Sequence, residues 1–531
     1  MPIIESLKAK LTPRPKDNKR IVIVGAGPTG LGAATRLSEL QYDNWVLFDS
    51  YDEAGGLAYT YKDPQGFLWD VGGHVIFSHY KYFDDVLDQA VAEYNTHERE
   101  SWVWMRGKFI PYPLQNNIGR LPPQDLEKCL HGLVEIQNAT YDAPPKNFEE
   151  WLMRKMGKGI YDVFLGPYNF KVWAHYPKDM NVEWMGERVA PVDLKKILSN
   201  VVHQRDDIGW GPNATFRYPK YGGTGAIWKG VADKLPQEKL RFKKTVKSVD
   251  ARKKVLVFSD GSVEKYDALV STMQLDTLCT LTQGLSGKGL AHKAPDFRYS
   301  TSHIIGLGIK GQPPAHLKSK AWMYFPEDDA PFYRCTVLSN YSEHMVPQPG
   351  KQWSLMFEVA QSAFKPVNKD TLVDEVIAGA KSTKLISESD EIVSRHHMIF
   401  DHGYPTPFYG RDQLCKPIFE ELERHDIYSR GRFGAWKYEV SNQDHSFMQG
   451  VEVADAVLGL DTSFAKQTTF LQPGVANAPQ TRNDDPFTKF ADQQAVAVPK
   501  KATHLIMRQE AVHNAAYEGG DSSPSASENS T

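Results

Sequence analysis

The sequence predicts an α/β protein of several domains, and three observations carry this prediction. A β-branched strand passes through a glycine-rich turn into a helix over 20–40, and apolar residues at helical spacing dominate 124–204. Strand-like runs return at residue 244 and continue to residue 359. At 531 residues the chain exceeds what one hydrophobic core usually serves, so two or three domains are expected.

Composition and charge argue against several classes of partner. The 62 Lys and Arg against 65 Asp and Glu leave a net charge of -3, which gives no general attraction for nucleic acid or an anionic membrane. The 4 cysteines are scattered without a C-x-x-C pair, which argues against a disulfide framework, a zinc site or a dithiol redox pair. No segment is apolar for long enough to span a bilayer. We therefore expect a cytoplasmic protein with no metal, no nucleic-acid partner and no membrane segment.

The N-terminal glycines predict a dinucleotide site. Gly25, Gly27 and Gly30 form G-x-G-x-x-G between a strand and a helix, and Asp49 follows a second strand. Such glycines allow a tight turn and close approach of a pyrophosphate to the helix N-terminus, while the acid can bind ribose hydroxyls. The motif alone is weak and could be an ordinary strand-turn-helix. The strand, helix and acid in register favour the dinucleotide.

The dinucleotide is expected to be FAD. The Gly55-Gly56 pair in "DEAGGLAYT" resembles the second glycine motif of FAD-dependent oxidoreductases, and "DALVSTM" resembles the strand that returns to their flavin domain. No second G-x-G-x-x-G stands between a strand and a helix, because the glycines of "GLGIKG" belong to the strand-like run "SHIIGLGIK". This argues against a permanent nicotinamide domain, although NADPH could reach the flavin transiently. The expected fold class is α/β, a Rossmann-like FAD-binding domain with a helical domain and an antiparallel-sheet domain.

Domain boundaries follow from these patterns. The expected parts are a polar leader at 1–19, a discontinuous FAD-binding domain at 20–98, 207–283 and 400–470, a helical substrate and oligomerisation domain at 116–206, an antiparallel-sheet substrate domain at 99–115 and 284–399, and a C-terminal extension with a disordered tail at 471–531.

The stretch "DVGGHVIFSH" raises a separate question, because two glycines stand directly before a histidine. Bare backbone at Gly72 and Gly73 permits positive φ and lets a flat ligand touch the main chain beside His74. From these residues alone, a tight turn with a packed histidine is the simpler interpretation.

Ten stretches, taken in order over roughly 20–460, resemble the UDP-galactopyranose mutase family of the eukaryotic type. They are "GAGPTGLGAA", "DVGGHVIFSHY", "PYPLQNNI", "PYNFKVWA", "GERVA", "GPNATFRYP", "AWMYFPED", "PFYRCTVLSNYS", "FDHGYPTP" and "GRFGAWKYEVSNQDHSFMQG".

The resemblance implies a non-redox reaction on UDP-galactopyranose and UDP-galactofuranose. In the family, N5 of reduced FAD attacks the anomeric carbon, UDP leaves, and the sugar opens and recloses as a five-membered ring. NADPH reduces the flavin, and the product serves cell-surface glycans. The resemblance also implies a homo-oligomer formed through the helical domain.

The resemblance assigns site residues, each with a simpler alternative. The glycine loop would lie against the flavin ring, and two arginines would bind the diphosphate unless they form structural ion pairs. The tyrosines could equally be core, and "SNQDHS" could be a surface loop. The implied catalytic residues are His74, Arg188 and Arg334. The implied cofactor-binding residues are Gly25, Gly27, Gly30, Asp49, Gly55, Gly56, Gly72, Gly73, Arg432, Asn442, Gln443 and Ser446. The implied substrate-binding residues are Tyr112, Gln115, Asn169, Trp173, Asn213, Trp322, Tyr324, Tyr404 and Tyr438, with His79 and Arg99 of second rank.

Two other functions compete with this one. A flavin amine oxidase-like or desaturase-like oxidoreductase would share the glycine motif and the returning strand, but an amine substrate gives no reason for cationic groups in its site. A nucleotide-sugar binding or assembly protein that keeps FAD for structure is the third possibility, and turnover with reduced flavin would exclude it.

Overall fold

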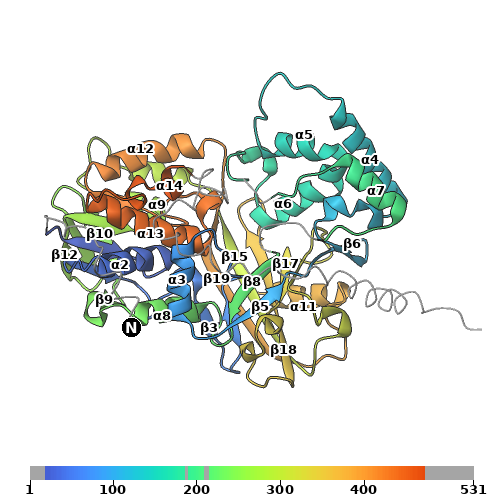
Figure 1. The fold of residues 1–531 in the computed structure, drawn as a ribbon, viewed down its shortest axis with the longest axis horizontal. Coiled ribbons are helices and arrows are strands. Elements are labelled where there is room, and N and C mark those ends of the chain that lie inside the picture. Colours follow the sequence, from blue (N-terminus) through green and yellow to red (C-terminus); the bar gives the residue numbers. More distant parts are fainter. Residues whose placement is uncertain (1–17, 186–188, 209–213, 473–531) are drawn as a thin grey trace, which may run out of the picture. The chain divides into compact units, whose positions relative to one another are not determined.

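A computed structural model describes residues 18–472, except 186–188 and 209–213 (Figure 1). These residues belong to one contact unit, Met1–Arg482. Nearly all of the expected leader, and the extension from residue 473, lie outside the described residues. None of the helices in the described ranges combines the length and apolar character needed to cross a membrane.

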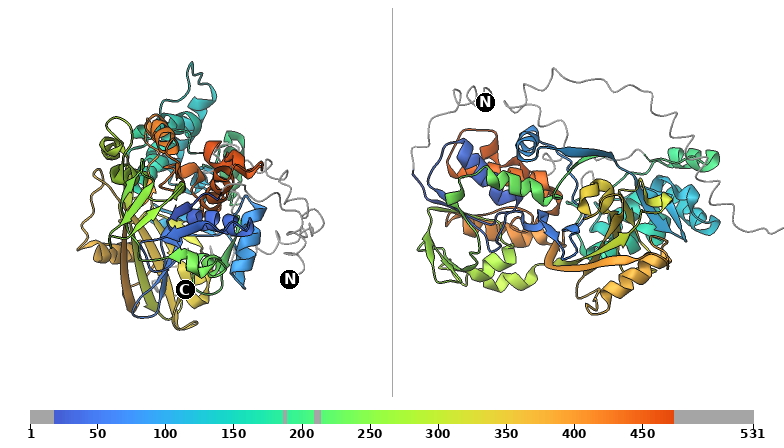
Figure 2. Two further views of the ribbon diagram at one scale, coloured as in Figure 1. Left: turned by 90° about the vertical axis from the view of Figure 1, so that its left-hand side faces the viewer. Right: turned by 90° about the horizontal axis from the view of Figure 1, so that it is seen from below.

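A parallel sheet of five strands, ordered β20-β13-β1-β2-β9, holds the glycine turn. Ile21 and Ile23 of β1 pack among residues of helices α2 and α13, while Val22 and Val24 pack on the opposite face. Helices α2 and α13 lie side by side although they are far apart in sequence (Figures 1 and 2). The returning strand β13 pairs with β1, which confirms the predicted Rossmann-like unit. The bounds are β1 Ile21–Val24, β2 Trp45–Phe48, β9 Leu240–Arg241, β13 Ala268–Ser271, β20 Ile427–Ser429, α2 Pro28–Glu39 and α13 Gln443–Val457.

The predicted helical region is present and encloses its own core. Its helices pack apolar faces around buried side chains such as Leu133, Leu152 and Trp173. Side chains cap two of the helices: Asn147 accepts a hydrogen bond from the Glu150 N–H, and Asp193 accepts from two N–H groups of the following turn. The bounds are α4 Pro123–Gln137, α5 Phe148–Ile160, a π-helical turn Tyr161–Leu165, α6 Gly166–Trp173 and α7 Leu194–His203.

A seven-stranded sheet, ordered β19-β15-β18-β17-β16-β6-β7, forms the third part. Helix α11, Leu372–Ser382, packs on its apolar face. The sheet is antiparallel as expected except at one pair, because β6 runs parallel to β16. Strand β19 also continues past the expected boundary at residue 399. The bounds are β6 Ser101–Met105, β7 Lys108–Pro111, β15 Tyr299–Lys310, β16 Trp322–Tyr324, β17 Arg334–Val337, β18 Gln352–Gln361 and β19 Ile392–Pro405.

Smaller elements connect these parts. They are the sheet β12-β11-β10-β14 with bounds Val263–Lys265, Val255–Phe258, Val246–Asp250 and Thr282–Gln283; the pairs β3 Thr60–Lys62 with β4 Leu68–Asp70 and β5 Tyr94–Glu98 with β8 Thr215–Pro219; and helices α3 Lys81–Ala90, α8 Gly225–Asp233, α9 Leu275–Leu281, α10 Leu338–Tyr341, α12 Arg411–Glu423 and α14 Thr468–Leu471.

Candidate active site

The first glycine turn is built for close approach of backbone to backbone. Gly25 has a φ of +107°, and a Cβ placed on Gly30 would lie 1.8 Å from the Gly25 carbonyl oxygen. Any side chain at Gly30 would therefore push helix α2 off the turn. The helix begins after Gly27 with no side-chain cap, so its first N–H groups are available to an anion.

Asp49 and the second glycine pair close this turn from the other side. Asp49 Oδ2 accepts a hydrogen bond from the Ala26 N–H at 2.5 Å, and the Gly55 N–H donates to the Ala26 carbonyl at 2.9 Å. A Cβ on Gly56 would lie 3.1 Å from Gly27 Cα. Burial raises the pKa of Asp49 while the Ala26 N–H opposes that shift. The carboxylate thus holds the turn, and its contact with a ribose stays a prediction.

The Gly72-Gly73-His74 segment leaves β4 and lies against the seven-stranded sheet. The Gly73 N–H donates to Glu358 Oε1 at 3.0 Å, and Gly72 has a φ of +90°. The His74 Nδ1 atom is buried without a hydrogen-bond partner among the described residues. Burial and the positive charge of Arg432 lower the pKa of His74 to about 3, so its imidazole is neutral.

Arg334 forms a two-pronged ion pair with Glu358. Its Nε and Nη2 donate to Oε1 and Oε2 of Glu358 at 2.6 and 2.7 Å. Burial alone would raise the pKa of Glu358, but the guanidinium holds it below its ordinary value. Arg334 is therefore a structural partner of Glu358. No bond to its Nη1 is present within the described ranges, and 21% of its side chain stays exposed.

A cavity of about 370 Å³ brings together most of the predicted substrate residues. Residues from the helical region, from the seven-stranded sheet and from the start of α13 all line it. The predicted residues that line it are Gly73, His79, Arg99, Tyr112, Gln115, Asn169, Trp173, Trp322, Tyr324, Arg334, Tyr404, Tyr438 and Asn442.

Part of the cavity wall has the chemistry of a base-binding site. The Tyr112 ring lies near Tyr324, with centroids 5.2 Å apart. Gln115 donates from Nε2 to the Ala190 carbonyl at 3.1 Å, which leaves Oε1 buried and unpartnered among the described residues. Asn169 is held by its bond to the Leu165 carbonyl at 2.8 Å. A fixed amide acceptor beside an aromatic ring suits a planar base with an N–H edge.

Further aromatic side chains line the same cavity. Trp322 Nε1 donates to the Tyr324 hydroxyl at 2.7 Å, which orients that phenol. Trp173 packs edge-on against Tyr438 at 4.8 Å, and Tyr404 lies 5.8 Å from Tyr438. Trp173 is both core and cavity wall, because only 3% of it is exposed.

The remaining predicted cofactor residues lie at the N-terminal end of α13 or, for Arg432, on an earlier turn whose side chain reaches that end. Arg432 donates from Nε and Nη2 to the Ser441 carbonyl at 3.2 and 3.1 Å, and its guanidinium lies 5.3 Å from the Tyr404 ring centre. Gln443 Oε1 accepts from Trp228 Nε1 at 2.8 Å, while its Nε2 is buried with no partner in the described part of the chain. The neighbouring Ser446 is buried.

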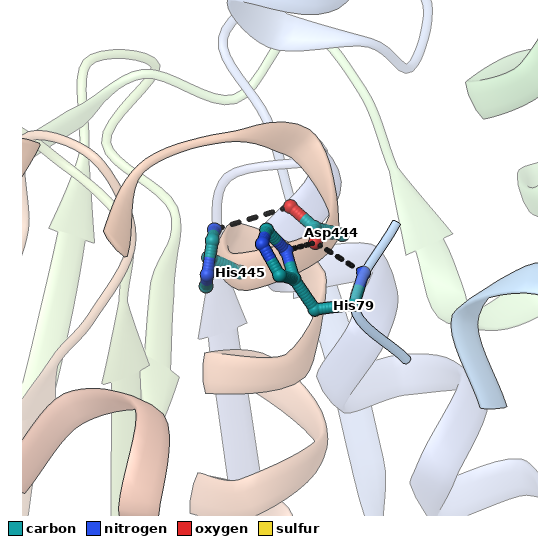
Figure 3. Close-up of side chains that lie close together, drawn as sticks. All are labelled: His79, Asp444 and His445. Atoms are coloured by element: carbon teal, nitrogen blue, oxygen red, sulfur yellow. Dashed lines mark hydrogen bonds and ion pairs between the residues drawn. The ribbon is translucent and has the colours of Figure 1, made fainter. Parts of the chain in front are cut away.

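A buried carboxylate between two imidazoles adjoins this helix end (Figure 3). Asp444 Oδ2 accepts from the backbone N–H of His79 at 3.1 Å and from its Nδ1 at 2.8 Å. Burial alone would raise the pKa of Asp444, but His445 and His79 hold it far below its ordinary value. Since an ionised carboxylate only accepts, His79 Nδ1 carries the proton and cannot ligate a metal. The three residues, whose ligand atoms lie within 4.8 Å of one another, thus combine the His79–Asp444 hydrogen bond with an ion-pair contact of 3.2 Å between His445 Nδ1 and Asp444 Oδ1.

Two predicted residues, Arg188 and Asn213, lie outside the described residues. Glu358 and Asp444 are functional candidates that sequence reasoning missed. Glu358 had a signal, as the single acid inside the apolar strand "WSLMFEVA", whereas Asp444 resembled a surface-loop residue. Further cavity residues that were not predicted are Tyr168, Trp184, Tyr333, Thr336 and Tyr341.

The residues present fit a flavin dinucleotide. The bare turn around Gly27 would be filled by any side chain, which is the geometry that a pyrophosphate needs. Two buried polar atoms, His74 Nδ1 and Gln443 Nε2, lack partners among the described residues and lie where the ring system is predicted. FAD would therefore be held by the turn, Asp49 and the start of α13.

Comparisons with known proteins identify the family of this chain. The family described as flavin containing amine oxidoreductase matches residues 28–331, which is more than half of the chain. A solved structure titled reduced UDP-galactopyranose mutase is 53% identical, covers 86% of this chain and 97% of its own, and superposes with a TM-score of 0.84.

Two other proteins are similar to this chain at lower sequence identity. A Klebsiella pneumoniae protein named "Probable UDP-galactopyranose mutase" is 28% identical over 31% of this chain and 43% of its own length. The chain thus matches less than half of that curated relative. Putrescine oxidase bound to putrescine is 12% identical, with a TM-score of 0.56 over 83% of this chain and 99% of its own, and shows the fold alone. On the extent of the 53% match, this chain belongs to the UDP-galactopyranose mutase family, whose fold is that of the flavin containing amine oxidoreductases.

Proposed function

We propose that this protein interconverts UDP-galactopyranose and UDP-galactofuranose without net oxidation or reduction. One observation carries the proposal: a single cavity joins the base-binding part of its wall at Tyr112 and Gln115, the Arg334 guanidinium, and Gly73 of the loop predicted to face the flavin. A nucleotide, a diphosphate and a sugar beside a flavin would occupy these three places in that order.

The chain's own residues would hold UDP throughout the reaction. Arg334 offers Nη1 to a phosphate oxygen while Glu358 keeps the other nitrogens fixed, and the phenols of Tyr324 and Tyr404 can donate hydrogen bonds to the same group. Burial raises the pKa of both tyrosines, so each keeps the proton that it donates. UDP that stays bound after the anomeric bond breaks can return to the rearranged sugar.

Bound FAD in its reduced form supplies the nucleophile, N5, for the anomeric carbon of the sugar. Gly73 provides backbone without a side chain beside the ring, and His74 provides an uncharged imidazole whose Nδ1 has no partner among the described residues. Arg188 is proposed as the second diphosphate cation, and Asn213 as a further residue of the substrate pocket.

Several finer points belong to the same proposal. NADPH reduces the flavin before turnover, the product serves cell-surface glycans, and copies of the chain associate through the helical region. The four cysteines are buried and unpaired, which suits a reducing, cytoplasmic location.

An amine oxidase-like reaction is the second candidate, favoured only by the family description. The cavity argues against it, because the Arg334 guanidinium would repel an ammonium substrate.

The test supplies UDP-galactofuranose under anaerobic conditions to the FAD-loaded protein, with and without chemical reduction of the flavin. We expect UDP-galactopyranose only with reduced flavin. Oxidation of an amine in place of isomerisation, or no sugar product at all, contradicts the proposal.

A further inference from the structure

Glu358 lies where the cavity wall, the Arg334 guanidinium and the glycine loop meet. It belongs to strand β18, opposite Arg334 in the antiparallel register with β17, and only 1% of it is exposed. The residue does not line the cavity itself, yet every group that donates to it does. It is therefore placed to act on the site through its neighbours.

Four hydrogen bonds are donated to the Glu358 carboxylate, two to each of its oxygens. Oε1 accepts from the Gly73 N–H at 3.0 Å and from Arg334 Nε at 2.6 Å. Oε2 accepts from Arg334 Nη2 at 2.7 Å and from the Tyr333 hydroxyl at 2.8 Å. Arg334 and the glycine loop thus share one oxygen atom, and neither can move without changing the bond of the other.

The glycine backbone is in direct contact with this carboxylate. A Cβ on Gly72 would lie 3.2 Å from Glu358 Oε2, and a Cβ on Gly73 would lie 3.6 Å from both Oε1 and Arg334 Cζ. No side chain separates the loop from the ion pair. A change at Arg334 is therefore transmitted through one hydrogen-bonded contact rather than through a long path.

Stability alone does not account for the arrangement. The free energy lost by removing two charges from water is about as large as the free energy gained from their attraction. An apolar pair of equal volume therefore often stabilises the fold equally well. Placing the pair at the cavity does something an apolar pair cannot, because it fixes two nitrogens of the guanidinium and leaves Nη1 for an anion.

We propose that Glu358 is a positioning residue that couples occupation of the anion site at Arg334 to the backbone position of Gly72 and Gly73. The inference rests on the proposed function, in which Arg334 binds the diphosphate and the glycine loop faces the flavin. A diphosphate that binds Nη1 pulls the guanidinium away from Glu358 Oε1. The hydrogen bond from the Gly73 N–H to the same oxygen then changes in length. Because such coupling is reciprocal, a shift of the loop also changes anion affinity.

The test titrates UDP, which lacks the galactose that would contact the flavin directly, into the FAD-loaded oxidised protein. Calorimetry gives the dissociation constant, and the visible absorption spectrum of the flavin reports the loop. We expect saturating UDP to shift the flavin spectrum of the unmodified protein, because Gly73 moves when Arg334 is engaged.

The variant Glu358→Gln breaks the coupling with little change of shape. Its amide nitrogen would face one of the two Arg334 nitrogens, and because the guanidinium only donates, the two-pronged bond cannot form. Loss of the negative charge favours UDP while loss of orientation disfavours it, so the dissociation constant stays within about tenfold. The spectral shift should fall below about half of its original size.

Two further variants keep the test decisive. Tyr333→Phe removes one donor to the same carboxylate and should cause a smaller loss of the shift, which matters if Glu358→Gln does not fold. Asp455→Asn removes a different buried carboxylate, which pairs with Arg36, and should keep the full shift.

Each outcome has one meaning. Equal spectral shifts in the unmodified protein and Glu358→Gln, or no shift in the unmodified protein despite UDP binding, overturn the coupling. Failure of the unmodified protein to bind UDP contradicts the proposed function itself. Loss of the shift in Asp455→Asn as well as Glu358→Gln shows a general effect of lost buried charge and also overturns the inference.

Discussion

Two arginines in different regions of this molecule form two-pronged ion pairs of the same geometry, which we call forks. Arg36 of α2 binds Asp455 of α13 through Nε and Nη2 at 2.7 and 2.9 Å, and Arg334 binds Glu358 in the same way at 2.6 and 2.7 Å. Only 4% of the Arg36 side chain is exposed, against 21% of Arg334. The first fork joins two helices, whereas the second lies at the wall of a cavity.

The difference teaches that placement, and not the ion pair itself, gives an arginine its role. A fork that is sealed between helices can only stabilise, because no ligand reaches it. A fork with one nitrogen unused beside a cavity can stabilise and also bind an anion. Mutations at the two sites should therefore separate into effects on folding and effects on UDP binding.

The largest effect on stability is expected from Arg36→Ala. This substitution leaves Asp455 buried without its cation, which costs about 3–5 kcal/mol of unfolding free energy. Urea denaturation of the FAD-loaded protein measures the loss. The UDP dissociation constant of the protein that remains folded should be unchanged, and a weakened UDP affinity would erase the distinction between the two forks.

Arg334→Ala should weaken turnover more selectively. Loss of a charge-assisted bond to the diphosphate is expected to cost about 2–4 kcal/mol, which lowers kcat/KM by roughly 30- to 1000-fold. Arg334→Lys should recover only part, because an ammonium lacks the planar fork.

The Arg334→Ala variant needs a companion because it leaves Glu358 as an unpaired buried carboxylate. Arg334→Ala combined with Glu358→Gln removes both charges and should regain thermal stability without regaining UDP affinity. Recovery of UDP binding in the double variant would show that Arg334 acts only as a structural partner.

Gln115→Leu should produce a moderate and local effect at the base-binding part of the cavity wall. The substitution removes the buried Oε1 acceptor that has no partner among the described residues, and UDP should bind about 1–2 kcal/mol more weakly. Pyrophosphate, which has no base, serves as the matched ligand and should bind equally to both proteins in a competition assay. An equal loss for both ligands would place Gln115 outside the base site.

Glu452 offers a different test, on pH dependence, at a buried carboxylate with no two-pronged cation among the described residues. It accepts from the N–H and the hydroxyl of Thr469, and burial raises its pKa to about 8. A group whose pKa is raised on folding contributes stability at acid pH that is lost as pH rises through that value. Glu452→Gln should therefore flatten the decline of unfolding free energy between pH 5 and about 8.5. An unchanged slope would show that Glu452 is ionised in the folded protein.

Local patterns in the sequence predicted the parts of this site that are formed locally. The glycine turn was accessible because its strand, turn and helix are adjacent in the chain, and the returning strand β13 was recognisable by its own residues. Periodicity likewise predicted helices α4, α5 and α7.

Contacts between distant strands could not be predicted in this way. The Arg334–Glu358 bond depends on the register of β17 against β18, and the Asp444–His79 bond joins a helix end to a loop 365 positions away. The parallel pairing of β6 with β16 escaped prediction for the same reason. A single sequence shows that Glu358 is an acid in an apolar strand, but only the fold shows which cation meets it.

The most direct test of the claim that the reaction has no net oxidation or reduction compares the NADPH consumed with the sugar product formed. Anaerobic protein is reduced with a limited amount of NADPH and supplied with excess UDP-galactofuranose, and the NADPH consumed is compared with the UDP-galactopyranose formed. We predict many product molecules for each NADPH, because isomerisation returns the flavin unchanged. One NADPH consumed for each product molecule would contradict the account.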